Sequence, residues 1–268
     1  MKGTSRPPRL LTIAGSDSGG GAGIQADLKT FAAHGVYGAS VVTAVTAQNT
    51  VSVTAIELVS PRLIAAQIDA VLADIDVDVV KIGMVGDSAT IAVIADRLVA
   101  HRNLPVVVDP VMVATGGAEL LGPESVGELG QRLLPLAVLV TPNVPEAERL
   151  SGLTIDDESG QIAAARAIAA RGPAVLVKGG HLAGDEVVDI LWVDGEAVRF
   201  AHRRIDSSST HGTGCTLSAA IAARLAMGER ISDAVGGAIE YLHGAIAAAY
   251  PVGRGHGPVD PLYRLFPR

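Results

Sequence analysis

Cysteine, aromatic residues and long apolar runs are scarce in this sequence. The one cysteine, Cys215, excludes an internal disulfide and any metal site built from several cysteines, as is typical of a reducing compartment. No apolar run approaches the roughly 18 residues of a membrane span, and the stretch 10–14 is too short for the core of a signal peptide. We therefore expect a cytoplasmic protein.

Basic residues are also too few and too scattered to form a patch. The formal net charge is −7, which argues against a nucleic-acid or an anionic membrane surface as partner. The partners expected are small molecules, with no nucleic acid and no membrane.

The residues that are plentiful are small and aliphatic. Hydrophobic residues make up 49% of the chain and aromatics only 3%, so Ala, Val, Leu and Ile must form the core. Apolar runs that read as strands alternate with helical segments, which predicts right-handed crossovers and a mostly parallel sheet covered by helices. We expect an α/β fold with residues 1–268 as a single domain.

The expected strands are 10–14, 39–47, 52–59, 78–82, 105–108, 137–140 and 174–177. The expected helices are about 24–34, 61–73, 88–102, 124–134, 158–170, 213–227 and 231–249. Asp194-Gly195 predicts a hairpin between 187–193 and 197–201, and the tail from Pro251 is expected on the surface.

The segment 209–220 combines two spaced glycines with the cysteine, directly before an apolar stretch of small residues. A helix is expected to begin here, with Thr213 or Thr216 as its cap and with first-turn amides pointing outward, which is an anion site. The helix dipole is expected to lower the pKa of the Cys215 thiol and favour the thiolate. The alternative is an ordinary glycine turn followed by a buried, inert cysteine.

Polar residues follow several expected strands, at Asp109, Asn143, Glu146 and Lys178. In parallel sheets this edge is where ligands bind. Asn143 and Glu146 are close enough to serve one hydrated Mg²⁺, Asp109 can join them electrostatically, and Lys178 can neutralise a transferring phosphoryl group. Each residue also has a plain structural alternative: Asn143 as a helix cap, Glu146 as a first-turn carboxylate, Asp109 as a turn residue, Lys178 as a surface charge.

Two common nucleotide motifs do not apply. The segment 21–26 fits G-x-G-x-x-A, but no acidic residue follows at the distance needed to hold a ribose, so a nicotinamide cofactor is rejected. No G-x-x-x-x-G-K-[ST] occurs, which excludes a Walker-type phosphate loop.

Seven segments together resemble a known family, in order and at family spacing from about Leu10 to Leu225. They are 14–29 (AGSDSGGGAGIQADLK), 46–50 (TAQNT), 81–84 (KIGM), 109–112 (DPVM), 141–147 (TPNVPEA), 177–181 (VKGGH) and 210–216 (THGTGCT). They resemble the signature of hydroxymethylpyrimidine/phosphomethylpyrimidine kinases, which belong to the ribokinase-like superfamily and act in thiamine biosynthesis.

The resemblance implies a three-layer α/β/α fold and an ATP- and Mg²⁺-dependent homodimer. The implied reaction phosphorylates 4-amino-5-hydroxymethyl-2-methylpyrimidine and then phosphorylates the monophosphate to the diphosphate. Cys215 stands where the wider superfamily carries Asp, and a thiolate there can accept the alcohol proton. A pyridoxal kinase of the same superfamily and a non-catalytic ligand sensor are the alternatives.

The site residues expected on these grounds fall into four groups. The catalytic residues are Cys215, Gly212, Thr213, Gly214 and Lys178; the substrate-binding residues are Gln48, Asp27, Met84 and Gly15; the ATP- and phosphate-binding residues are Asn143, Lys178, Thr213 and Asp109; and Glu146 and Asp109 hold Mg²⁺ through water. The Gln48 amide can pair with the exocyclic amine and ring nitrogen of an aminopyrimidine, and Met84 offers a polarizable surface to the ring. For His211 we expect a role in stabilising the turn rather than in chemistry.

Overall fold

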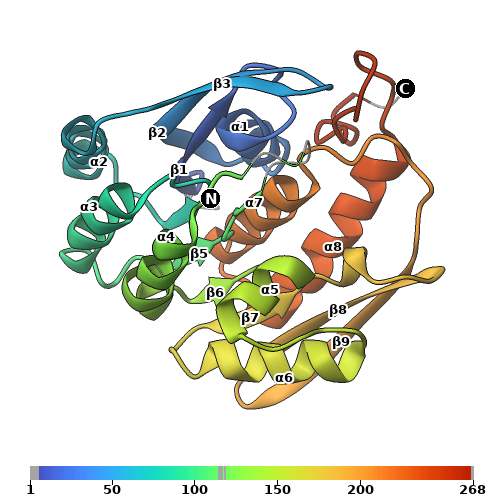
Figure 1. The fold of residues 1–268 in the computed structure, drawn as a ribbon. Helices are drawn as coiled ribbons and strands as arrows, with labels where there is room; N and C mark the ends of the chain where they lie inside the picture. The colour runs from blue at the N-terminus through green and yellow to red at the C-terminus, as the bar shows by residue number, and fades with distance from the viewer. Residues whose placement is uncertain (1–5, 114–116, 118, 267–268) are drawn as a thin grey trace, which may run out of the picture.

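One twisted sheet runs through the molecule, with helices on both faces (Figure 1). The computed structural model describes residues 6–113, 117 and 119–266. Within these ranges the sheet has nine strands in the order β3-β2-β1-β4-β5-β6-β7-β8-β9. Their bounds are Arg9–Asp17 (β1), Tyr37–Gln48 (β2), Val53–Leu58 (β3), Val79–Ile82 (β4), Val106–Val108 (β5), Leu139–Val140 (β6), Ala174–Val177 (β7), Glu186–Val193 (β8) and Glu196–Arg203 (β9). The six strands β2, β1, β4, β5, β6 and β7 pair in parallel with their neighbours in that order. The pairs β2–β3, β7–β8 and β8–β9 are antiparallel. The predicted α/β class with a mostly parallel sheet is confirmed.

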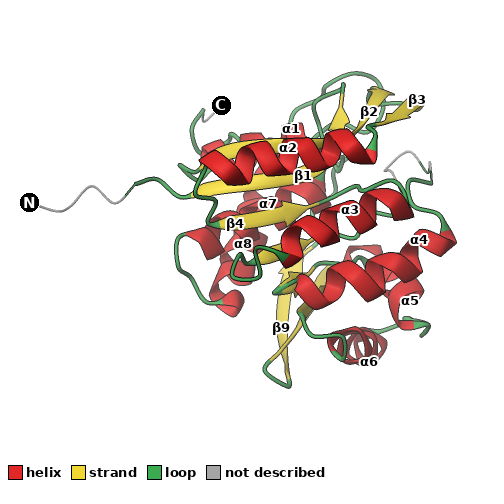
Figure 2. Ribbon diagram, turned by 90° about the vertical axis from the view of Figure 1, so that its left-hand side faces the viewer, coloured by secondary structure: helices red, strands yellow, loops and turns green. Residues whose placement is uncertain are grey.

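The helices divide between the two faces of the sheet. Their bounds are Gly23–Ala33 (α1), Pro61–Asp74 (α2), Ser88–Val99 (α3), Pro123–Glu128 (α4), Val144–Ser151 (α5), Glu158–Ala169 (α6), Thr213–Ala226 (α7) and Ile231–Ala247 (α8). One face packs against α2 to α6 and the other against α1, α7 and α8. Figure 2 shows α2, α3 and α4 in front of the strands that they cover. The three-layer arrangement follows from this division.

Alternation along the strands decides which side chain meets which layer of helices. In β1, Leu11 and Ile13 pack with α2 and α3, while Leu10 packs with Phe31 of α1 and with α7. Successive side chains of a strand point to opposite faces, so a continuous apolar run is what a sheet covered on both sides requires.

The sequence-based prediction missed one helix, α5. It begins at Val144, after a short connection from the expected strand end at Val140. The signal was present in the sequence, because Asn143 and Glu146 form a capping box and Pro145 stands in the first turn. The segment was interpreted only as a strand-end loop, with capping as the alternative.

The predicted hairpin is confirmed, since Asp194 and Gly195 both take positive φ between β8 and β9. The prediction for the tail was partly wrong. Residues 251–256 are exposed, but Gly257 and Val259 to Pro261 are buried. The backbone of this buried segment hydrogen-bonds to the N–H and to the C=O of His211.

None of the helices in the described ranges combines the length and apolarity needed to span a bilayer.

The central strand should carry far more of the stability than the edge strand. Ile13 on β1 is 0% exposed and Ile56 on β3 is 37% exposed. We expect Ile13→Ala to lower the free energy of unfolding by about 2–5 kcal/mol and the matched Ile56→Ala by less than about 1 kcal/mol, measured by urea denaturation. Similar losses in both variants would contradict this account of the core.

Candidate active site

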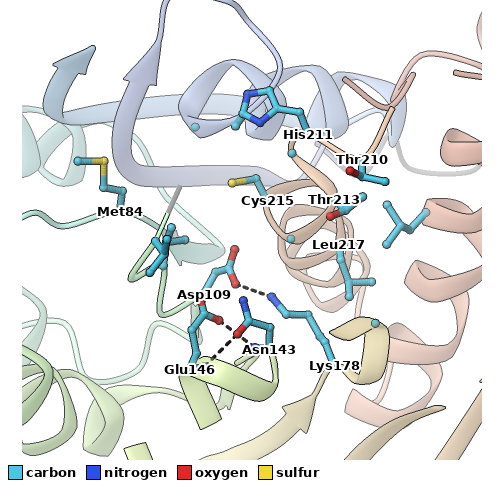
Figure 3. Close-up of a pocket in the computed structure, with 18 of the residues that line it drawn as sticks. Met84, Asp109, Asn143, Glu146, Lys178, Thr210, His211, Thr213, Cys215 and Leu217 are labelled. Atoms are coloured by element: carbon cyan, nitrogen blue, oxygen red, sulfur yellow. Dashed lines mark hydrogen bonds and ion pairs between the residues drawn. The ribbon is translucent and has the colours of Figure 1, made fainter. Parts of the chain in front are cut away.

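A cavity of ≈ 680 Å³ opens at the carboxyl ends of the parallel strands. Each of these strands delivers a side chain to it at or just beyond its last residue. The residues are Asp17 (β1), Gln48 (β2), Met84 (after β4), Asp109 (after β5), Asn143 (after β6) and Lys178 (after β7). The first turn of α7 closes one wall, and Figure 3 shows its Cys215 sulfur between Met84 and the Asp109–Lys178 pair. The predicted ligand-binding edge is therefore the edge that holds the cavity.

The N-terminus of α7 is shaped by Gly212. Gly212 is the N-cap residue with φ +79°, and a Cβ there would lie 1.9 Å from the carbonyl oxygen of Gly21, so only glycine fits. The helix begins where it was predicted, but the proposed Thr213 or Thr216 cap is wrong because no side chain caps this end. Within the described ranges no acceptor is shown for the N–H groups of Gly214 and Cys215. These amides remain available for an anion.

Lys178 and Asp109 form an ion pair against this helix end. The Lys178 Nζ donates to Asp109 Oδ1 at 3.0 Å, and the hydroxyl groups of Thr141 and Ser218 donate to the same carboxylate at 3.1 and 3.3 Å. A Cβ on Gly214 would lie 3.2 Å from Lys178 Nζ, so the glycine lets the ammonium approach the helix. Burial alone would lower the pKa of Lys178, but Asp109 and Glu146 raise it above its ordinary value, so the lysine is charged.

Asn143 and Glu146 cap α5 reciprocally. The Glu146 amide donates to Asn143 Oδ1 at 3.0 Å, and the Asn143 amide donates to Glu146 Oε2 at 2.8 Å. Both side chains also line the cavity. Burial raises the pKa of Glu146 to about 7, with Lys178 opposing the rise and Asp109 adding to it.

The acidic side chains do not form a ready-made cage for a cation. Among the described residues, no group of three or more His, Cys, Asp and Glu side chains converges on a metal-sized space. Asp109 is already engaged by Lys178, Thr141 and Ser218, and Glu146 uses Oε2 for the helix cap. The Glu146 carboxylate also accepts a backbone hydrogen bond from Met112, so it suits a cation held through water better than one bound directly.

The prediction for the ionisation of Cys215 was wrong for this ligand-free form. Burial raises the pKa of the thiol to about 11, against the lowering effect of the Lys81 ammonium, and Asp27 and Asp109 add to the rise. The helix terminus is real, but it does not outweigh burial and two neighbouring carboxylates. The sulfur does lie in the same cavity as Gln48 and Lys178, as the predicted chemistry requires.

The predicted substrate residues Gln48, Met84 and Gly15 all line the cavity. A Cβ on Gly15 would lie 2.9 Å from the Met84 sulfur, so this glycine makes room for the methionine. The Thr46 hydroxyl donates to Gln48 Oε1 at 3.2 Å, and Gln48 Nε2 lies 3.3 Å from His211 Nε2.

The fourth predicted substrate residue, Asp27, does not line the cavity. It is 0% exposed, pairs with Lys81 Nζ at 2.9 Å and accepts from the Thr12 hydroxyl at 2.6 Å. The structure thus places this carboxylate in contact with Lys81 and Thr12, and its contact with a substrate stays a prediction.

Asp17 is a site residue that the sequence analysis quoted in a motif without assigning it. Its carboxylate lies 2.9 Å from His211 Nε2 and accepts the backbone N–H groups of Gly19, Gly21 and Ala22. Burial alone would raise the pKa of Asp17, but the hydrogen bonds from His211 and the loop amides lower it overall. The structure thus gives His211 the turn-stabilising contact that was expected, because it ties the α7 turn to the β1 loop.

The far end of the cavity was not predicted at all. It is lined by Val187, Asp189, His202, Arg204, Leu242 and Ile246, which come from β8, β9, the loop that follows them and α8. Arg204 donates to the carbonyl oxygens of Gly180, Leu182 and Gly184, and so fixes the loop that follows Lys178. Because these residues come singly or in pairs from separate elements, they form no sequence motif from which this end of the cavity could have been predicted.

This fold is shared with pyridoxal and phosphomethylpyrimidine kinases of known structure. The crystal structure of a Bacillus subtilis pyridoxal kinase in complex with ADP superposes with a TM-score of 0.90 at 38% identity, covering 97% of this chain and 100% of that one. The likeness extends over the whole sheet and both helix layers.

The sequence comparisons are more specific. The phosphomethylpyrimidine kinase family model matches residues 17–260, so the chain belongs to that family. It is 56% identical over 258 residues to the hydroxymethylpyrimidine/phosphomethylpyrimidine kinase of Rhizobium meliloti, covering 95% of this chain and 97% of that protein. It is 55% identical over 255 residues to the thiamine biosynthesis bifunctional protein ThiED of Geobacter sulfurreducens, where the match covers 94% of this chain but only 52% of that protein. The chain thus spans about half the length of the Geobacter protein.

The contact between Gly212 and Gly21 should show in stability. We expect Gly212→Ala to be destabilising by at least about 2 kcal/mol more than Gly228→Ala, since both glycines take positive φ but only Gly212 has a backbone atom against it. Urea denaturation of the two variants measures the difference. Equal losses would mean that torsional strain alone accounts for Gly212.

Proposed function

We propose that this protein transfers the γ-phosphoryl group of ATP to the hydroxymethyl group of 4-amino-5-hydroxymethyl-2-methylpyrimidine, and then to the resulting monophosphate. One observation carries the proposal: a single cavity is lined by Gln48 and Met84 and also by Cys215, Lys178 and the first turn of α7 with its open amides. A group that can recognise an aminopyrimidine thus shares the cavity with a group of anion-binding donors. The names of the Rhizobium and Geobacter relatives agree with this substrate.

Gln48 is proposed to read the pyrimidine. An amide presents an acceptor and a donor side by side, which suits an exocyclic amine next to a ring nitrogen. The Thr46 hydroxyl donates to the oxygen of this amide, and Met84 supplies the apolar face on which the ring rests. Gly15 allows the ring to approach the backbone.

The nucleotide is proposed to lie along the other half of the cavity. The amides of Gly212 to Cys215 receive the transferring phosphoryl oxygens, Lys178 neutralises them, and Asn143, Thr213 and Asp109 flank the remaining phosphates. The unpredicted far end, beside β8 and α8, is then left for the nucleoside. The ADP complex of the Bacillus pyridoxal kinase supports a nucleotide in this fold.

Mg²⁺ fits this site as a partly hydrated ion rather than as a caged one. Glu146 would hold it through water, with Asp109 adding negative charge nearby, and the ion would neutralise charge on the phosphates. With its pKa at about 7, Glu146 is close to half ionised near neutral pH, and a cation favours the ionised form. We further propose that the chain acts as one kinase domain, as a homodimer and in the cytoplasm.

Cys215 is proposed as the proton acceptor in the first phosphorylation. The thiol first loses its proton to solvent. The O–H bond of the alcohol then breaks, its proton passes to the thiolate sulfur, and the oxygen bonds phosphorus as the bond between phosphorus and the ADP oxygen breaks. Because the transition state of phosphoryl transfer is loose, the amides and Lys178 contribute more than the base. The second phosphorylation starts from a phosphomonoester that is already largely dianionic near neutral pH, since its second pKa is about 6.

The test of this function is a substrate comparison. Purified protein is assayed with ATP and Mg²⁺ for ADP release and product formation on the aminopyrimidine alcohol, its monophosphate and pyridoxal. We expect both pyrimidines to be phosphorylated, with kcat/KM for the alcohol at least about tenfold above that for pyridoxal. A preference for pyridoxal would favour the pyridoxal kinase alternative, and binding without turnover would favour the ligand sensor.

Removing the thiol should separate the two steps. We expect Cys215→Ala to slow the first phosphorylation at least about tenfold and the second less than about threefold in single-turnover experiments. Cys215→Ser should be as slow as Cys215→Ala in the first step, because a serine hydroxyl ionises far less readily. Equal losses in both steps, or rescue by serine, would contradict the proton-transfer role.

A further inference from the structure

A buried ion pair lies beneath the first turn of α7, outside the cavity. Lys81 of β4 and Asp27 of α1 are both 0% exposed, and Lys81 Nζ lies 2.9 Å from each carboxylate oxygen. The Thr12 hydroxyl completes the cluster by donating to Asp27 Oδ2. A buried ion pair is rarely the most stable filling of a core, so its presence in this apolar layer calls for another explanation.

Strand geometry aims Lys81 at the helix layer that carries Cys215. In β4, Val79 packs with α7 and α8, while Val80 and Ile82 pack with the opposite layer. Lys81 alternates with Val80 and Ile82, and its bonds to Asp27 on α1 place it on the side of Val79. A Cβ on Gly83 would lie 2.9 Å from Lys81 Nζ, so this glycine leaves the ammonium its space.

The Cys215 sulfur accepts the backbone N–H of Gly23 at the start of α1, and four charged groups act on it electrostatically. They are Lys81 from β4, Asp27 from α1, Asp109 after β5 and Lys178 after β7. Of these, Lys81 has the largest effect on the thiol, and it favours the thiolate. Burial would lower the pKa of Lys81, but Asp27 and the other anionic groups raise it, so the ammonium keeps its proton at neutral pH.

We propose that Lys81 is a positioning residue for the first phosphorylation: its buried ammonium is the counter-charge against which Cys215 ionises, and Asp27 anchors it there. The inference rests on the proposed proton-acceptor role of Cys215. The thiol loses its proton to solvent, the sulfur then takes the proton of the substrate hydroxyl, and Lys81 transfers none. Asp27 thus serves the reaction without touching the substrate.

The single cysteine makes the proposal directly measurable. The pH dependence of alkylation by iodoacetamide, followed as the mass added to the peptide that contains Cys215, reports on this residue alone. We expect Lys81→Met to raise the apparent pKa of the thiol by at least about one unit, which slows alkylation about tenfold below that pKa. We expect Asp27→Asn to raise it too, because the buried Lys81 loses the carboxylate that keeps it protonated. A thiol pKa left unchanged by Lys81→Met would overturn the proposal.

Lys81→Met leaves a carboxylate buried without its partner and is the variant at risk of not folding. The double variant Asp27→Asn/Lys81→Met removes both charges, and we expect its thiol pKa to lie above that of the unmodified protein, because Lys81 outweighs Asp27. An unchanged pKa in the double variant would overturn the proposal by itself. The control is Arg132→Met, which breaks an exposed ion pair with Asp96 and should leave the thiol unchanged.

Kinetics connect the titration to the reaction. We expect the double variant to slow the first phosphorylation at least about tenfold with little change in the second or in KM for ATP. Equal slowing of both steps would overturn the positioning role. If the unmodified protein phosphorylates neither pyrimidine, the proposed function fails, while the thiol titration still decides whether Lys81 controls Cys215.

Discussion

The backbone contact between Gly212 and Gly21 is the constraint on which the site depends. It brings the turn before α7 against the loop after β1, two segments almost 200 residues apart in the chain, and a single Cβ at Gly212 would prevent it. His211 and Asp17 close the same junction with a side-chain bond, and the buried part of the tail pairs with the backbone around His211. With this junction made, the open amides of α7 face the ends of the parallel strands.

Charge in the site is arranged in two tiers. The first tier lines the cavity and consists of Lys178, Asp109 and Glu146. The Lys178 ammonium is bonded to the Asp109 carboxylate, and a phosphate that enters the cavity can replace this partner. Lys81 and Asp27 are sealed beneath it and keep their partners. Burial raises the pKa of the Cys215 thiol, with Lys81 opposing the rise and Asp27 and Asp109 adding to it, so the thiol is neutral although a helix begins beside it.

Local signals were sufficient for much of the fold. The strand and helix alternation, the Asp194-Gly195 hairpin and the start of α7 depend on residues close in sequence, and all are confirmed. The helix α5 was missed although its capping box was visible, because Asn143 and Glu146 were considered first as metal ligands. One cavity is lined by most of the predicted site residues, as the shared edge of parallel strands requires. They are Gly15, Gln48, Met84, Asp109, Asn143, Glu146, Lys178 and Cys215.

The sequence by itself determined the α/β class, the strand edge that binds ligands and most side chains that gather there, because strand periodicity, glycine turns and strand-end polarity are local properties. Only the tertiary structure decided that Asp27 is sealed against Lys81, that the thiol is protonated, that part of the tail is buried and that β8 and α8 build the far end of the cavity. Each of these depends on burial or on charges brought from distant segments, and pairwise electrostatics depends on distances that no local pattern contains.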